Sequence, residues 1–65
     1  MIKLGKYKHF KGMEVEVIGV AKHSETLEEL VIYRHEGELW ARPIAMFEEE
    51  VEVDGRKVPR FEFIT

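Results

Sequence analysis

A run of four polar residues, His23-Ser24-Glu25-Thr26, is the densest group of reactive side chains in this sequence. An imidazole, two hydroxyls and a carboxylate could read the polar edge of a base or a sugar. Binding residues are often found on such loops, because a rigid scaffold positions them. The simpler interpretation is that Ser24, Glu25 and Thr26 hydrogen-bond the backbone of their own loop. We expect a loop at residues 22–28, with at most one helical turn.

Catalysis by the same run is a weaker hypothesis. Ser24 follows His23, but neighbours on a loop rarely point at each other, and no G-x-S-x-G motif surrounds the serine. Nucleophilic catalysis also needs a third group that orients the base. His23 and Glu25 could act as an acid–base pair, which predicts a bell-shaped dependence of rate on pH. We expect that the protein is not an enzyme.

Aromatic residues and arginines form the second group. Trp40 and Arg42 are two residues apart in an expected strand, so they share one face of it. Exposed aromatic rings beside guanidinium groups suit stacked bases or anionic ligands. The alternative is that Trp40 fills a small second core while Arg42 pairs with the acidic run 48–50. The predicted ligand surface consists of His23, Ser24, Glu25, Thr26, Tyr33, Trp40, Arg42 and Arg60.

Three histidines, His9, His23 and His35, could in principle bind a transition metal together with a carboxylate. Their spacing contains no H-x-H or H-x-x-x-H pair. We therefore expect partly exposed histidines at strand ends and turns, with no metal site and no cofactor. His23 is the best candidate ligand if a metal does bind, because Glu25 could orient it.

The totals describe a small soluble domain. The chain has 65 residues, of which 45% are hydrophobic and 35% charged, and a net charge of −3. It predicts one folded domain spanning residues 1–65. The absence of cysteine and of a long apolar run fits a cytoplasmic protein without membrane contact. Residues 1–24 hold five lysines against two glutamates, whereas residues 25–65 hold five basic residues against eleven acids. We expect a surface on which acidic and basic residues are mixed. The alternative is a basic edge that binds an anionic ligand.

Short strands and tight turns must position these residues. Alternation over 13–21 indicates a strand with Val15 and Val17 on one face, and Gly19 suggests a bulge. We expect a hairpin of 29–35 with 38–43 around Glu36-Gly37. The Thr26-x-x-Glu29 pattern resembles a helical capping box, but the run that follows is rich in β-branched and aromatic residues, which favours a strand.

The C-terminal part predicts a second hairpin. Pro43 ends the preceding strand, and residues 44–47 predict one helical or 3₁₀ turn. Asp54-Gly55 between alternating residues is typical of a type I′ turn. Together these elements predict an all-β fold, a small, strongly bent SH3-like barrel of five or six short strands. The expected core consists of Val15, Val17, Val20, Val31, Tyr33, Leu39, Phe47 and Val51.

Four segments resemble a family of short bacterial proteins known only as a domain of unknown function, DUF1653. They are GKYKHFKG (5–12), EVIGVAKHSETLEELVIYR (16–34), LWARPIAMF (39–47) and VEVDGRKVPRF (51–61). The turn between Arg34 and Trp40 is shorter than the family pattern. The resemblance implies a small β fold and no particular reaction. The matching positions are Gly5, Tyr7, His9, His23, Ser24, Glu25, Thr26, Tyr33, Trp40, Arg42, Pro43, Phe47, Pro59, Arg60 and Phe61.

The sequence thus predicts a non-enzymatic binding module. Its expected ligand is a nucleotide or a single-stranded nucleic acid, held by aromatic stacking and by Arg and His donors. The alternative is a protein-interaction module that reads an extended peptide through an aromatic groove. We expect a monomer or a weak homodimer, because small β domains expose edge strands.

Overall fold

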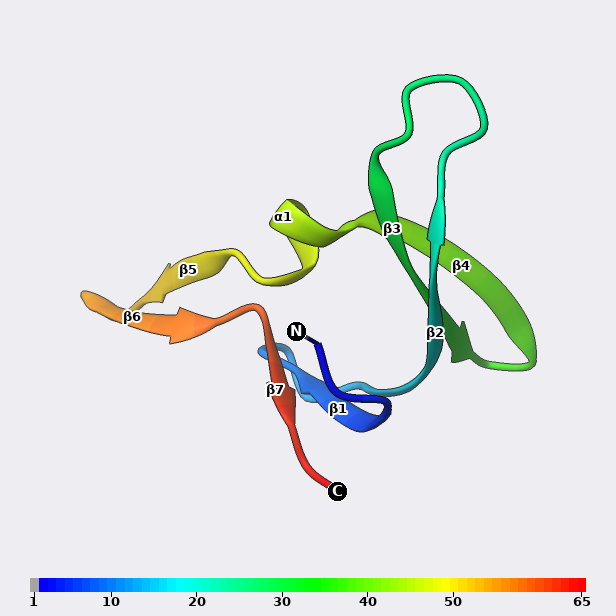
Figure 1. Cartoon of the computed structure of the whole chain (residues 1–65). Helices are drawn as coiled ribbons and strands as arrows, with labels where there is room; N and C mark the ends of the chain where they lie inside the picture. The colour runs from blue at the N-terminus through cyan, green and yellow to red at the C-terminus, as the bar shows by residue number, and fades with distance from the viewer. Residues whose placement is uncertain (1) are drawn as a thin grey trace.

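The computed structural model describes residues 2–65 and contains seven strands and one helical turn. Five strands form one antiparallel sheet in the order β4-β3-β2-β1-β7, and β5 and β6 form a separate hairpin (Figure 1). The elements are β1 (Gly5–His9), β2 (Glu14–Lys22), β3 (Glu29–His35), β4 (Glu38–Pro43), α1 (Ile44–Phe47), β5 (Glu50–Val53), β6 (Arg56–Pro59) and β7 (Phe61–Phe63).

The five-stranded sheet is bent but not closed. Its two edges are β4 and β7, and these strands do not pair with each other within residues 2–65. The mostly-β prediction is confirmed, whereas closure into an SH3-like barrel is not. The strand count of five or six was too low, because β6 and β7 are separate strands on either side of Arg60.

Both predicted hairpins are present. β3 pairs with β4 from Leu30↔Pro43 to His35↔Glu38, and β5 pairs with β6 around Asp54-Gly55. The φ angles are 53° and 79° at Glu36 and Gly37, and 51° and 78° at Asp54 and Gly55. Positive φ at both central residues is the hallmark of the type I′ turn, whose twist matches that of the flanking strands. The helical turn after Pro43 is also confirmed.

A bulge interrupts β2 between Val17 and Gly19, where the sequence suggested one. Val17 lies opposite Tyr33, and after the bulge Val20 lies opposite Val31. Residues directly opposite each other share a face. The extra residue, Ile18, therefore moves Val20 onto the inner face that Val15 and Val17 occupy before the bulge, whereas unbroken alternation would have placed it on the other face.

The core lies on the concave face of the sheet beneath α1. Three residues assigned to it from the sequence are not buried: Val20 is 41% exposed, Leu39 is 61% exposed and Val51 is half-buried. Val20 lies in the part of β2 beyond Val17, which pairs with β3 but no longer with β1. Leu39 points away from the concave face on the edge strand β4. The buried residues are Tyr7, Val15, Val17, Val31, Tyr33, Phe47 and Phe61.

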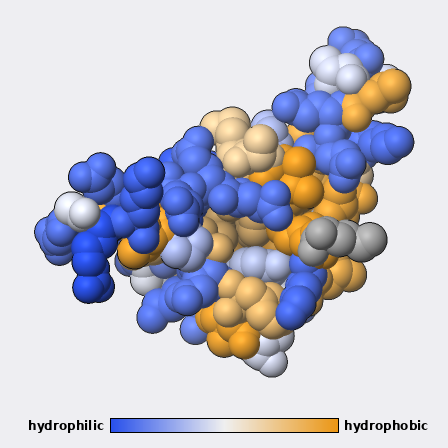
Figure 2. All heavy atoms as spheres, turned by 60° about the vertical axis from the view of Figure 1, so that its left-hand side comes forward, coloured by the Kyte–Doolittle hydropathy of each residue, from blue (hydrophilic) through white to orange (hydrophobic). Residues whose placement is uncertain are grey.

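Two polar projections extend from this body. The loop between β2 and β3 rises at one end of the sheet, and the β5–β6 hairpin extends on another side (Figure 1). Figure 2 shows mostly hydrophilic residues on both projections and apolar residues gathered over the body between them. Within residues 2–65 there is no helix with the length and apolar character needed to span a membrane.

Candidate functional site

Trp40 and Arg42 lie on the concave face of the sheet. In the β3–β4 ladder Trp40 is opposite Tyr33, and Arg42 is opposite Val31, which is fully buried. Leu39 therefore points to the outside. Trp40 is 47% exposed and makes no ring–ring contact with another aromatic residue of the described chain. The alternative in which Trp40 fills a second core is therefore wrong.

Arg42 reaches across the concave face to the opposite edge strand. Its Cζ lies 5.6 Å from the ring centroid of Phe61 on β7. It forms no ion pair with a carboxylate of residues 2–65. A small cavity of about 100 Å³ opens beside it, which we call the Arg42 pocket. The pocket is lined by His9, Met13, Val15, Tyr33, His35, Arg42 and Phe61.

His9 forms one wall of the Arg42 pocket. Its ring centroid is 4.9 Å from that of Phe61 and 4.5 Å from that of Phe10. Its Nδ1 accepts a hydrogen bond from the backbone N–H of Lys11 at 3.1 Å, so neutral His9 carries its proton on Nε2. Partial burial lowers the pKa of His9, and nearby positive charges lower it further. These charges belong, in decreasing order of effect, to Arg60, Lys11, Arg42 and His35.

Arg60 supports this region from the side. Its Nη2 donates to Glu49 Oε1 at 2.6 Å, and its Cζ lies 6.0 Å from the ring centroid of Phe10. Its Nε is buried and has no hydrogen-bond partner within the described part of the chain. The arginine that pairs with the acidic run 48–50 is therefore Arg60, and the alternative that assigned this role to Arg42 is wrong.

The polar loop, residues 23–28, is separate from the Trp40–Arg42 face. Lys22 pairs with Glu29 at the end of the β2–β3 ladder next to the loop, whereas Trp40 lies beside Tyr33, four residues farther along β3. At about 3.3 Å per residue this places Trp40 roughly 13 Å from the base of the loop. Arg42 is opposite Val31, about 7 Å along β3 from that base, but its guanidinium extends to Phe61 on β7. The structure therefore divides the predicted ligand surface into two parts.

The polar loop is folded around the His23 ring. His23 Nδ1 accepts hydrogen bonds from the backbone N–H groups of Glu25 at 3.1 Å and Thr26 at 3.3 Å. Thr26 Oγ1 accepts one from the Glu28 N–H at 3.2 Å. No capping box forms, because Leu27 has a φ of 64° and the chain then enters β3. The predicted bonding of side chains to the loop backbone is confirmed for Thr26 but is not seen for Ser24 or Glu25, and the principal acceptor is His23, which the prediction did not include.

Replacing His23 with alanine should loosen the polar loop without altering the body of the sheet. Two backbone N–H groups would lose their acceptor, at a net cost of about 1 kcal/mol each or less because the loop is exposed. We expect faster amide hydrogen exchange at Glu25 and Thr26 in the labelled protein. Asparagine at this position should restore part of the protection, because its side-chain oxygen can accept the same bonds. Unchanged exchange in the alanine variant would contradict this role of His23.

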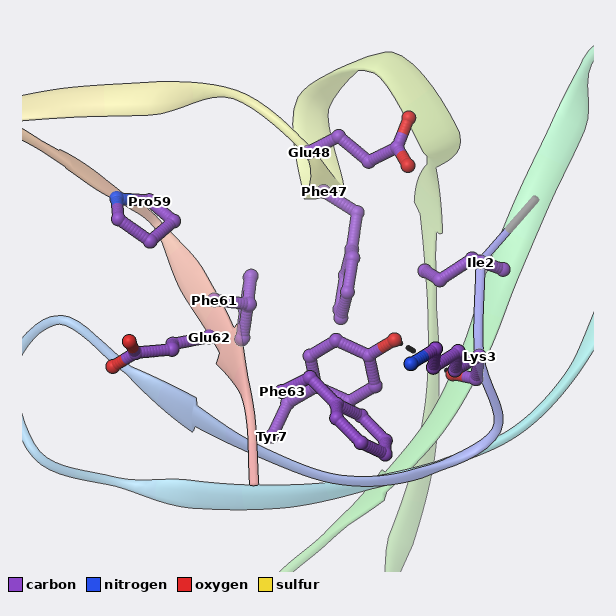
Figure 3. Close-up of a pocket in the computed structure, with 9 residues that line it drawn as sticks. All are labelled: Ile2, Lys3, Tyr7, Phe47, Glu48, Pro59, Phe61, Glu62 and Phe63. Atoms are coloured by element: carbon purple, nitrogen blue, oxygen red, sulfur yellow. Dashed lines mark hydrogen bonds between the residues drawn. The ribbon is translucent and has the colours of Figure 1, made fainter. Parts of the chain in front are cut away.

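A second and larger cavity of about 340 Å³ lies on the other side of Phe61. Figure 3 shows its aromatic floor, with Tyr7 donating a 2.6 Å hydrogen bond from its hydroxyl to the Lys3 carbonyl. Burial raises the pKa of Tyr7; the Lys3 hydrogen bond opposes that rise and the charge of Glu48 adds to it. Because Glu48 and Glu62 line this cavity, it is less suited to an anionic ligand than the Arg42 pocket.

The structure brings together residues that sequence reasoning did not combine. Arg42 and Tyr33 were predicted site residues, but His9, His35 and Phe61 join them only in three dimensions. One signal was available, since the Glu36-Gly37 hairpin by itself places Trp40 opposite Tyr33. Among residues 2–65, no group of three or more His, Asp or Glu side chains could hold a metal ion.

Comparison with known proteins shows the family of the chain. The model of a protein family of unknown function, DUF1653, matches residues 5–63. The chain belongs to the DUF1653 family. A crystal structure of a DUF1653 protein from Bordetella bronchiseptica is similar to it, with a TM-score of 0.87 and 28% sequence identity. The similarity covers 97% of this chain and 87% of the Bordetella chain. No curated protein matches this DUF1653 chain.

Proposed function

We propose that this DUF1653 protein is a non-enzymatic binding module for a nucleotide-like ligand, either free or as part of a single-stranded nucleic acid. In this proposal the bent sheet acts as an SH3-like barrel left open between β4 and β7, and the ligand docks at the opening. The observation that carries the proposal is Arg42, which crosses the concave face to Phe61 without a carboxylate partner in residues 2–65.

The base and the phosphate of such a ligand can contact different residues on this face. A base can stack on the exposed ring of Trp40, which has no aromatic partner of its own within the described residues. Arg42, two residues along the same strand face, can donate to the polar edge or to a phosphate. Stacking of one base on an aromatic side chain contributes about 1–3 kcal/mol.

The net charge of −3 limits how such a module attracts its ligand. Long-range attraction to a polyphosphate is not available, so binding depends on the local cations near Arg42. Single-stranded ligands release counterions with a slope of roughly −0.7 per neutralised phosphate on a log–log salt plot. Only a few contacts are available here, so the proposal predicts a measurable but shallow salt dependence.

A peptide-binding module is the second candidate function. The observation in its favour is the edge strand β4, whose outer side pairs with no strand in residues 2–65 and whose Leu39 and Trp40 are exposed. An extended peptide could add a strand there. Its binding would depend on backbone hydrogen bonds and apolar contacts, and would respond little to salt.

Changing Arg42 to alanine tests the proposed function. We expect adenosine monophosphate to shift the amide signals of residues 40–42 in the labelled protein. The R42A variant should bind roughly 10- to 100-fold more weakly, because a hydrogen bond to a charged group contributes about 1.5–3 kcal/mol. Arg56→Ala is the matched control, since Arg56 lies on the β5–β6 hairpin.

Both variants must show an amide spectrum as dispersed as that of the native protein, so that a loss of binding is not a loss of folding. Equal weakening by Arg56→Ala would indicate non-specific charge attraction and overturn the proposed site. An absence of shifts with the nucleotide and with a short thymidine oligonucleotide would reject the nucleotide ligand. Shifts along β4 with an extended peptide would then favour the second candidate.

A further inference from the structure

We propose that the Arg42 pocket receives a phosphate monoester, so that the ligand is a nucleoside phosphate recognised through its terminal phosphate group. This inference rests on the proposed function and adds to it the chemical class of the ligand. It assigns a direct role to His9, which lies at the end of β1, three strands away from the β4 strand of Trp40.

Cationic and protonatable groups converge on two neighbouring rings. Arg42 Cζ lies 5.6 Å from the Phe61 centroid, with the His9 ring 4.9 Å from that same centroid. On the other side of His9, the Phe10 ring has Arg60 Cζ at 6.0 Å and Lys11 Nζ at 5.8 Å. His9 thus lies between two groups of positive charge that come from separate segments of the chain.

The lining of the pocket contains no carboxylate. Of the acids nearby, Glu49 is paired with Arg60 at 2.6 Å, and Glu36 lies 3.8 Å from Nε2 of His35. These pairs also compensate part of the positive charge of Arg60 and His35. The charge that an anion in the pocket would meet comes chiefly from Arg42, which forms no ion pair within residues 2–65 and favours a phosphate over a neutral group.

The volume of the Arg42 pocket limits which part of the ligand can enter it. Its volume is about 100 Å³. A water molecule occupies about 30 Å³ of liquid, so the pocket has room for a group of a few heavy atoms. A phosphate group fits this space, whereas a whole nucleotide does not. The nucleoside would remain outside, on the side of β4 where Trp40 is exposed.

His9 is prepared to donate to such a phosphate. Its Nδ1 is occupied by the Lys11 N–H, so its Nε2 is the donor in the neutral form. Burial and the surrounding positive groups, Arg60, Lys11, Arg42 and His35, lower the pKa of His9 in the free protein. A bound phosphate dianion would oppose the repulsion from these cations and raise the pKa of His9. Binding should therefore take up a proton and strengthen as pH falls toward the phosphate's own second pKa, about 6.

The test compares adenosine, adenosine monophosphate and inorganic phosphate on the labelled protein. We expect the monophosphate to bind at least about tenfold more tightly than adenosine, as one charge-assisted contact would produce. The signal of the His9 ring should titrate at higher pH in its presence than in its absence. His9→Asn keeps an acceptor for the Lys11 N–H, and should reduce the preference for the monophosphate to the part that Arg42 supplies. His23→Asn is the matched control and should change neither the preference nor the titration of His9.

The outcomes separate this inference from the proposed function. If adenosine and its monophosphate bind equally well, the nucleotide module stands and the phosphate pocket is rejected. If His9→Asn leaves the difference intact, the assignment to His9 is overturned. If inorganic phosphate binds as tightly as the monophosphate and shifts His9, the pocket is supported but the base adds nothing, which overturns the proposed function. If none of the three binds, both proposals fail.

Discussion

Replacing Phe47 with alanine is expected to abolish the cooperative fold. Phe47 is the largest fully buried side chain and is 1% exposed. Its ring stacks on Phe61, with centroids 4.2 Å apart and planes 4° apart, and meets Tyr7 edge-on at 5.3 Å. Removing a buried phenyl group costs about 3–5 kcal/mol. A single core of this size rarely provides more than about 3–5 kcal/mol in total.

The measurement is the dispersion of the amide spectrum together with thermal unfolding followed by circular dichroism. The neighbouring residue Met46 provides the control, because it lies in the same helical turn but is exposed. Met46→Ala should change the free energy of unfolding by less than about 0.5 kcal/mol. A folded and cooperative Phe47→Ala protein would mean that the aromatic cluster is not the principal source of stability.

Replacing Gly5 with alanine is expected to detach the C-terminal end of the chain from β1. Gly5 has a φ of 134°, and an added Cβ would lie 2.5 Å from the Thr65 carbonyl oxygen. That oxygen accepts a 2.8 Å hydrogen bond from the Lys6 N–H, and the Ile64 N–H donates to the Lys6 carbonyl at 2.7 Å. To avoid the new methyl group the Thr65 carbonyl oxygen must move, and the hydrogen bonds that hold the C-terminal end against Lys6 would break.

Gly12 provides a control that separates the clash from backbone strain. Its φ is 101°, but nothing lies within 4 Å of the position that an added methyl group would take there. Strain alone costs about 1–3 kcal/mol at either glycine. We therefore expect a lower melting temperature for Gly5→Ala than for Gly12→Ala, by roughly 4–8 °C per additional kcal/mol. Amide exchange at Lys6 and Ile64 should rise only in Gly5→Ala, and equal exchange in both variants would contradict the clash.

Local turn chemistry made much of the fold predictable. A type I′ turn requires positive φ at both of its central residues. Glu36-Gly37 and Asp54-Gly55 adopt that conformation, which few other pairs of residues do readily. Once the first turn is placed, the register of β3 with β4 follows. The bulge at Gly19 and the helical turn after Pro43 were predictable for the same reason, because each depends on a residue with a restricted or unusual backbone.

The burial of individual residues depended on information that is not local. Val20 is exposed because it lies beyond the part of β2 that pairs with β1, and Leu39 is exposed because it lies on the outer face of the edge strand β4. The capping-box pattern at Thr26 failed for another reason. The His23 ring accepts hydrogen bonds from the backbone N–H groups of Glu25 and Thr26, and these bonds stabilise a turn in place of a helix.

The candidate site was predictable only in part. Trp40 and Arg42 share a face by simple alternation, and the hairpin adds Tyr33 opposite Trp40. The approach of Arg42 to Phe61 requires the bend of the whole sheet, since β4 and β7 lie at its two edges. No local sequence pattern encodes that approach. The presence of His9 in the site depends on the same bend of the sheet.

The alternation of inner and outer side chains along β2 determines where a chain of this fold can change in length. A residue inserted or lost between Val15 and Val17 would exchange the inner and outer sets of side chains through the core strand. The same change within residues 23–28, beyond the last pair of the ladder, would leave every inward residue in place. A peptide tag or a permuted terminus introduced in that loop should therefore be tolerated.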